Sequence, residues 1–443
     1  MDIKLSDHFT AIRLIRFTLP TMGMLVITSL YTVVDGFFVS NFVGKTAFVA
    51  VNLIFPFILI PSTLGTMIGT GGSALVAKTL GEGKADRANR QFSLLVYFAI
   101  ALGISLSLLW LPFLRPAATF LGAEGDILEA CLAYGRILIP GLTPMILQYM
   151  FQSFFPLAEK PRLGLWITIA AGMTNILLDA FFILVCGWGL IGAAIATVAG
   201  MLVGALPPLI IFSRPDNSQL RIGRPHFDLF TLVKSCTNGS SEFMTNVSIS
   251  FVAMLYNFQL LRLAGENGVA AYGVIMYIGF IAISLSCGYA FGSIPIIGYH
   301  FGAKDTQELK GIFRKSLLIN TIFGILLTCI GLTVSYPMVY LFVKYDSFLL
   351  NMAQHACILY SFSFFFAGFN IFASSFFTAL NNGFISAGIS FVRTLAFQVI
   401  AVLVLPLWLD LDGIWLATTA AEAGTLGISI LCFRLMGKIY GYR

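Results

Sequence analysis

Charged residues are scarce in this sequence: they make up only 10% of its 443 residues, and histidine occurs only four times. Hydrophobic residues make up 58%, and the mean hydropathy is +0.91. Soluble domains carry roughly 25% charged residues, so this composition excludes a string of soluble domains. The chain is therefore predicted to be an integral membrane protein.

Cysteine is also used sparingly, and the seven cysteines stand singly along the chain. No two of them have the spacing of a metal site or a redox motif. We interpret them as apolar packing residues, in preference to disulfides or metal ligands. The first sixteen residues lack the apolar core of a signal peptide, so the first helix is expected to stay attached.

Long apolar windows fill most of the sequence from Ile12 onward. A membrane-spanning helix needs about 20 mostly apolar residues, and twelve windows reach this length. The predicted spans are 12–37, 47–76, 91–113, 127–152, 163–186, 190–212, 236–262, 268–297, 313–336, 348–376, 384–408 and 413–435. The predicted fold class is an all-α polytopic membrane protein with twelve transmembrane helices.

One polar segment, rich in arginine and proline, interrupts this series near its middle. It predicts three parts: an N-lobe of residues 1–212, a linker of residues 213–235 and a C-lobe of residues 236–443. Lysine and arginine favour one side strongly, with 20 in the segments on the side of the termini and four in the opposite loops. By the positive-inside rule, both termini and the linker are cytoplasmic. The net charge of +6 then reflects topology and indicates no nucleic-acid partner.

The two halves resemble each other at an ungapped offset of 221 residues. Gly44 falls on Gly265, and Gly81 falls on Gly302. Similarly, Gly192, Ala196 and Thr197 fall on Gly413, Ala417 and Thr418. Six helices per copy make the repeats parallel, with a pseudo-two-fold axis along the membrane normal. Such repeats are typical of transporters whose halves rock about a central site.

Four acidic residues lie within the predicted spans: Asp35, Asp179, Glu242 and Glu422. A charged group there costs about 3 kcal/mol on insertion scales, so it normally faces protein or a water-filled cavity. Only two basic residues, Arg136 and Arg393, lie within spans.

In the N-lobe, Asn175 and Asp179 are four residues apart and share one helix face. If the helices bundle compactly, Asp35 and Thr197 converge on them. Two carboxylates, an amide and a hydroxyl hold either a shared proton or Na⁺. The alternative is a polar contact that only fixes helix packing.

The C-lobe candidates allow two interpretations each. Glu242 lies near the inner end of the seventh span, where it either takes part in transport or reaches cytoplasmic water. Glu422 and Arg393 form either a structural ion pair or part of a substrate cavity.

The first span ends in Val34-Asp35-Gly36-Phe37, glycine and charged residues gather in the loops Gly81 to Arg87 and Gly302 to Asp305, and Lys160-Pro161-Arg162 follows the fourth span. Over essentially the whole chain, these motifs resemble the multidrug and toxic compound extrusion (MATE) family of cation-coupled exporters. The resemblance implies an N-lobe cation site formed by Asp35, Tyr134, Asn175, Asp179 and Thr197. Some members also bind a cation in the second lobe with an Asp of the tenth helix. The tenth span here contains no acid, which argues against such a site.

The resemblance implies a secondary active transporter of the plasma (inner) membrane that exchanges H⁺ or Na⁺ for amphipathic, often cationic compounds. No cofactor is expected, no metal beyond a possible Na⁺ at the Asp35/Asp179 pair, and function as a monomer in the lipid bilayer. A flippase for lipid-linked sugars is the nearest alternative, but it would need several basic residues in its cavity. A membrane-embedded enzyme is disfavoured, because no nucleophile and base are paired.

Overall fold

A computed structural model describes residues 3–214, 219–344 and 346–442, and these residues form helices and no strands. The first half contains α1 (Ala11–Phe38), η1 (Val39–Val43), α2 (Lys45–Gly81), α3 (Ala85–Trp110), η2 (Leu111–Phe113), α4 (Leu114–Phe120), α5 (Gly125–Leu138), α6 (Leu142–Leu157), α7 (Pro161–Asp179), η3 (Ala180–Val185) and α8 (Gly189–Ser213). The second half contains α9 (Leu229–Gly302), α10 (Thr306–Val343), α11 (Ser347–Ser361), α12 (Ser363–Ala379), α13 (Gly383–Phe391), η4 (Val392–Ala396), α14 (Phe397–Val404) and α15 (Pro406–Tyr440). The segments η1, η3 and η4 are π-helical.

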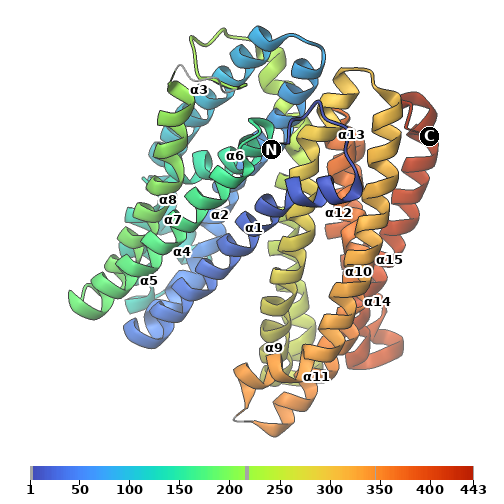
Figure 1. The fold of residues 1–443 in the computed structure, drawn as a ribbon. Coiled ribbons are helices and arrows are strands. Elements are labelled where there is room, and N and C mark those ends of the chain that lie inside the picture. Colours follow the sequence, from blue (N-terminus) through green and yellow to red (C-terminus); the bar gives the residue numbers. More distant parts are fainter. Residues whose placement is uncertain (1–2, 215–218, 345, 443) are drawn as a thin grey trace.

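The helices account for twelve membrane spans within the described residues. Nine helical segments are long and apolar enough to cross a membrane alone, and the bent pairs α5/α6 and α11/α12 supply two more. The segment α9 supplies the twelfth, because its 74 residues would extend about 110 Å, several times the thickness of a bilayer core. Its backbone breaks at Gly265, and Figure 1 shows its two arms running in opposite directions. The expected twelve-helix architecture is confirmed.

The repeat is visible in the turn that joins the first two helices of each half. Gly44 has φ +122° and Gly265 has φ +61°, a region that favours glycine because it has no Cβ. These are the two glycines that the 221-residue offset aligns. Both halves therefore make their first turn at a glycine with a positive φ angle.

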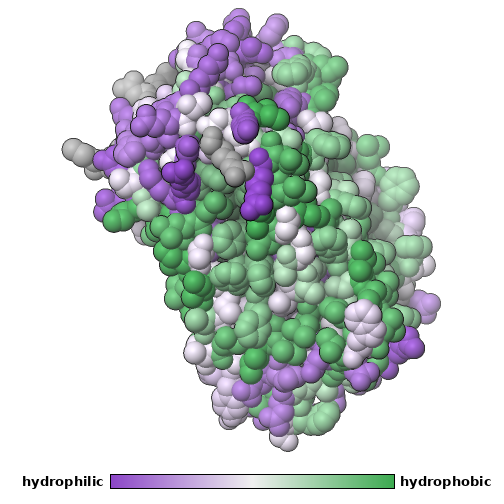
Figure 2. All heavy atoms as spheres, turned by 90° about the vertical axis from the view of Figure 1, so that its right-hand side faces the viewer, coloured by the Kyte–Doolittle hydropathy of each residue, from purple (hydrophilic) through white to green (hydrophobic). Residues whose placement is uncertain are grey.

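The surface carries the hydropathy pattern of a membrane protein. Figure 2 shows a broad apolar band between two polar ends of the molecule. Large side chains such as Leu108, at 71% exposed, and Met254, at 71%, lie on the surface. Exposed apolar residues at this density match contact with lipid.

The two lobes form a V in Figure 1, with α1 to α8 in one arm and α9 to α15 in the other. They converge at the end that carries both termini, here called the terminal end, and separate toward the opposite, far end. The helix α9 begins at Leu229, so it starts within the segment assigned to the linker.

Glycines allow the lobes to touch closely at the terminal end. A Cβ at Gly81 would overlap the carbonyl oxygen of Tyr299, and one at Gly302 would overlap the carbonyl oxygen of Lys78. The same offset of 221 residues relates both members of these two contacts. The closed end is therefore a nearly symmetrical crossing of α2 with the second arm of α9.

Residues 3–10, here called the N-terminal strap, bind both lobes at the terminal end. The N–H of Leu5 donates to Glu159 Oε1 of the N-lobe at 2.6 Å. In the C-lobe, the N–H of Phe9 donates to Glu308 Oε1 at 2.8 Å, and His8 Nδ1 lies 2.6 Å from Glu308 Oε2. Leu5 and Phe9 are fully buried. The strap therefore ties the two lobes together where they already touch.

Candidate functional site

Two acidic side chains of the N-lobe lie where regular helices give way to π-helical turns. Asp35 is in the last turn of α1, shortly before η1, and Asp179 is the last residue of α7, directly before η3. A π-helical turn widens the backbone spiral and frees local hydrogen-bonding groups, and such turns are frequent at functional sites. The backbone thus departs from the α-helix beside both carboxylates.

The structure brings the five N-lobe candidates together. The side chains of Asp179, Asn175 and Thr197 lie close to the carboxylate of Asp35. The amide Nδ2 of Asn175 faces Thr197 Oγ1 at 3.5 Å, and the Tyr134 side chain lies near Thr197 and both carboxylates. These side chains come from α1, α5, α7 and α8, so the two carboxylates lie in the interior of the N-lobe. We call these five residues the N-lobe cluster.

Several oxygens of this cluster have no hydrogen-bond donor. Asp179 is fully buried, and both of its carboxylate oxygens lack a donor, as do Asp35 Oδ1 and Asn175 Oδ1. Buried oxygens without donors are costly, and two facing carboxylates are costlier still when both are ionised. A proton shared between the carboxylates, or a small hard cation, would satisfy them. The donor set therefore fits either coupling ion.

Tyr31 is a neighbour of this cluster that the sequence analysis missed. It precedes Asp35 by one helical turn on α1, and its hydroxyl accepts from Gln148 Nε2 at 3.4 Å. The four-residue spacing was the available signal, because it places both side chains on one helix face.

The C-lobe candidates form a separate group. Arg393 Nε donates to Glu422 Oε1 at 2.8 Å, so the ion pair considered from the sequence is present. Asn370 Nδ2 donates to Glu422 Oε2 at 2.7 Å, and Ser429 Oγ donates to Asn370 Oδ1 at 2.9 Å. Arg393 lies in the π-helical segment η4. Asn370 was missed because only acids were sought in the tenth span.

Glu242 lies near this ion pair and away from the N-lobe cluster. Its side chain is half-buried on the first arm of α9 and interacts electrostatically with Arg393. The eight predicted site residues thus divide into two groups, one in each lobe.

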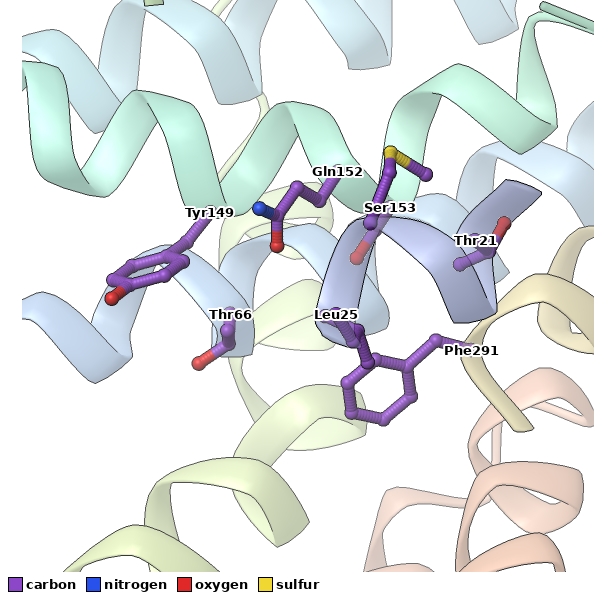
Figure 3. A pocket seen from close by; sticks show the side chains of 8 residues that line it. Thr21, Leu25, Thr66, Tyr149, Gln152, Ser153 and Phe291 are labelled. Carbon is purple, nitrogen blue, oxygen red and sulfur yellow. The ribbon is translucent and has the colours of Figure 1, made fainter. Parts of the chain in front are cut away.

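A small cavity of about 20 Å³ lies between the lobes, with room for about one water molecule. Figure 3 shows side chains from α1, α2, α6 and α9 around it, with Phe291 as the contribution of the C-lobe. None of the eight predicted site residues lines this cavity. It marks the packed contact between the lobes and is not the predicted ion site.

The described residues contain no group of three or more histidine, cysteine or acidic side chains arranged to hold a metal ion. All seven cysteines are free.

Comparison with known proteins relates the chain to transport proteins. It is 23% identical over 365 residues to the multidrug export protein MepA of Staphylococcus aureus and 22% identical over 364 residues to MepA of Staphylococcus haemolyticus, with 80% of each chain covered. A solved structure of MATE in complex with MaL6 superposes with a TM-score of 0.93 at 20% identity, covering 98% of both chains.

A second solved structure, the outward-facing conformation of a multidrug resistance MATE family transporter, gives a TM-score of 0.91 at 21% identity. It covers 97% of this chain and 96% of its own. These likenesses show the same two-lobe fold. The MatE family model matches residues 20–181 and 243–403, which is most of the chain. The chain therefore belongs to the MatE family, the MATE family that its sequence motifs resemble.

Proposed function

We propose that this protein is a cation-coupled antiporter that exports amphipathic, often cationic compounds from the cell. The observation that carries the proposal is the N-lobe cluster, in which two facing carboxylates have oxygens without donors. If these side chains served only to pack the helices, a neutral pair would do so at lower cost than two buried carboxylates. The N-lobe cluster is suited to bind and release a cation.

The shape of the molecule supports alternating access. The lobes meet at the terminal end and separate at the far end, and the distribution of lysine and arginine favours a cytoplasmic terminal end. With that orientation, the two lobes diverge toward the outside. Access from the cytoplasm requires the crossing at Gly81 and Gly302 to open and the N-terminal strap to release one lobe.

Exchange follows from the charge of the N-lobe cluster. When Asp35 and Asp179 are both ionised, they repel each other across α1 and α7. A proton or Na⁺ entering from the far end removes that repulsion and lets the helices pack differently. The ion then biases one of the two states by its differential affinity for them, and drug release accompanies the change.

The substrate class is supported by the relatives and by the C-lobe. The relatives named above are multidrug export proteins. Glu242 and Glu422 outnumber Arg393 in the C-lobe group, so this side of the protein favours cationic compounds. We propose small amphipathic or cationic molecules as substrates, with no nucleic-acid partner, no cofactor and no catalysis. We further propose a monomer in the plasma (inner) membrane.

The flippase alternative has less support. A flippase would use basic side chains to hold a diphosphate, and Arg393 already pairs with Glu422. Arg136 is exposed on α5.

Ethidium efflux from proteoliposomes under separate pH and Na⁺ gradients tests the proposal. Wild-type efflux should follow one gradient, and Asp35→Asn should abolish it while the protein stays folded. Asp126→Asn is a matched control, because this exposed acid begins α5 at the far end. Efflux in Asp35→Asn at the wild-type rate would refute the proposed coupling, and no efflux under either gradient would favour the flippase.

A further inference from the structure

An open cleft of about 360 Å³ lies between the first turns of α3 and residues 221–224 of the linker. It belongs to the terminal end of the molecule, where the linker runs (Figure 1). Its charged lining residues are three arginines and one acid: Arg90, Arg221, Arg224 and Asp86. All four side chains are exposed. We call this space the linker cleft, and its walls carry an excess of positive charge.

Apolar contacts hold the linker wall of this cleft in place. Leu220 is fully buried, and Ile222 packs against the same apolar core. The N–H of Ile222 donates to the carbonyl oxygen of Phe212, near the end of α8, at 2.7 Å. Between these two anchored residues, Arg221 faces solvent.

Hydrogen bonds then attach the linker directly to α3. The N–H of Arg221 donates to Asn89 Oδ1 at 2.7 Å, and the N–H of Gly223 donates to Ser93 Oγ at 2.9 Å. Ser93 is 1% exposed, so this contact is buried. The fold therefore places the linker arginines beside Arg90 of the helix.

The three guanidinium groups lack a counter-charge of their own. None of them forms an ion pair with another side chain in the described part of the chain. Like charges that line one cleft repel each other, and guanidinium groups bind phosphate through parallel N–H donors. The volume of the linker cleft is within the range of small-ligand sites. These properties suit a phosphate group that carries an organic substituent.

The outer face of α3 beyond the linker cleft is apolar. Tyr97 and Ile104 follow Arg90 at steps of seven residues, about two helical turns each, so the three side chains share one face. Both are exposed, as is Leu108 one turn further along. An exposed apolar stripe of this kind contacts lipid chains. Arg90 lies at the end of the stripe, at the level expected for lipid headgroups.

We propose that the linker cleft binds the phosphate group of an anionic phospholipid whose acyl chains lie along the apolar stripe of α3. Arg90 belongs to the helix, whereas Arg221 and Arg224 belong to the linker, so a bound headgroup stabilises the docked linker. A free phosphate shares the headgroup chemistry but makes no contact with the stripe. This inference does not depend on the proposed transport function, because it concerns lipid binding outside the N-lobe cluster.

The test is the thermal stability of the purified full-length protein in detergent with added dioleoylphosphatidylglycerol, dioleoylphosphatidylcholine or sodium phosphate. Wild type should melt a few degrees higher with phosphatidylglycerol than with phosphatidylcholine, because a ligand of the folded state stabilises it. Sodium phosphate at the same concentration should have a smaller effect. The variant Arg90→Gln/Arg221→Gln/Arg224→Gln should lose the difference between the lipids. Arg90→Gln alone should lose part of it.

A matched control removes three exposed basic side chains from the C-lobe at the same end of the molecule, in Arg314→Gln/Arg434→Gln/Lys438→Gln. This control should keep the wild-type preference for phosphatidylglycerol. An equal loss in the control would indicate general attraction between basic residues and anionic lipid, and it would overturn the proposal. A wild-type preference in Arg90→Gln or in the triple cleft variant would also overturn it. Stabilisation by sodium phosphate equal to that by phosphatidylglycerol would overturn the assignment to a lipid.

Discussion

The two lobes share one scaffold but carry their ionisable groups at positions that do not correspond. At the 221-residue offset, Asp35 falls on Tyr256 and Asp179 falls on Ile400. The C-lobe counterpart is neutral and satisfied, since the Tyr256 hydroxyl lies 2.8 Å from Thr418 Oγ1 and donates to Gln398 Oε1 at 3.0 Å. A hydrogen-bonded tyrosine here fixes the packing without any ion.

The reverse comparison gives the same result. Arg393 falls on Gly172 and Glu422 falls on Met201 in the N-lobe, so no ion pair is possible there. Gly172 instead leaves room for the ring of Tyr31, whose Cδ1 would lie 2.9 Å from an added Cβ. The repeat therefore conserves helix crossings and turns, while each lobe has its own buried charges. Duplicated architecture does not imply duplicated chemistry.

The largest expected effect breaks the C-lobe ion pair. Glu422→Gln should lower the free energy of unfolding by about 3–5 kcal/mol, because Arg393 is left buried without a counter-charge. Denaturation of the purified variant would measure this. Replacing both residues with apolar side chains of similar size should restore much of the loss, and a single variant as stable as wild type would contradict a tight ion pair.

Replacing an acid of the N-lobe cluster should raise the stability of the protein instead of lowering it. Asp179→Asn should raise the free energy of unfolding by about 1–3 kcal/mol, since it removes a buried carboxylate whose oxygens have no donors. The same variant should lose ethidium efflux. Denaturation and efflux measured on one preparation check both expectations. A destabilised variant would mean that Asp179 has a structural partner, and the contrast between the lobes would fail.

Tyr256, the neutral counterpart of Asp35, should contribute less to stability. Tyr256→Phe should cost about 1 kcal/mol of stability, the contribution of ordinary neutral hydrogen bonds to Thr418 and Gln398. Efflux should continue at a rate near that of wild type. A complete loss of efflux would place part of the coupling chemistry in the C-lobe.

The smallest effect concerns the strap that joins the lobes. Burial raises the pKa of Glu159, although the N–H of Leu5 and nearby Lys4 act against it. The folded protein therefore binds this proton more tightly than the unfolded chain does. Stability should increase slightly as pH falls through the raised pKa and level off below the ordinary carboxyl pKa. Melting curves across this pH range should lose the slope in Glu159→Gln, and an unchanged slope would exclude Glu159 as its source.

Much of this molecule is predictable from local composition. The spans follow from apolar windows, and the grouping of Asp35, Asp179 and their polar neighbours follows from acids placed where the membrane makes them costly, whereas Tyr134 was implied by the family resemblance. The N-terminal strap was not predictable, because Leu5 and Phe9 form hydrogen bonds with residues far away in the sequence, Glu159 and Glu308. The break of α9 at Gly265 agrees with the 221-residue offset, which aligns this glycine with Gly44. The π-helical turns that follow Asp35 and Asp179 have no sequence signature.

Ion movement measured together with drug efflux tests the central claim most directly. Proteoliposomes loaded with ethidium would report H⁺ or Na⁺ uptake for wild type, Asp35→Asn/Asp179→Asn and Tyr256→Phe. We expect coupled ion uptake in wild type and Tyr256→Phe, and none in the N-lobe double variant. Ion-coupled efflux that persists in Asp35→Asn/Asp179→Asn would contradict the assignment of coupling to the N-lobe.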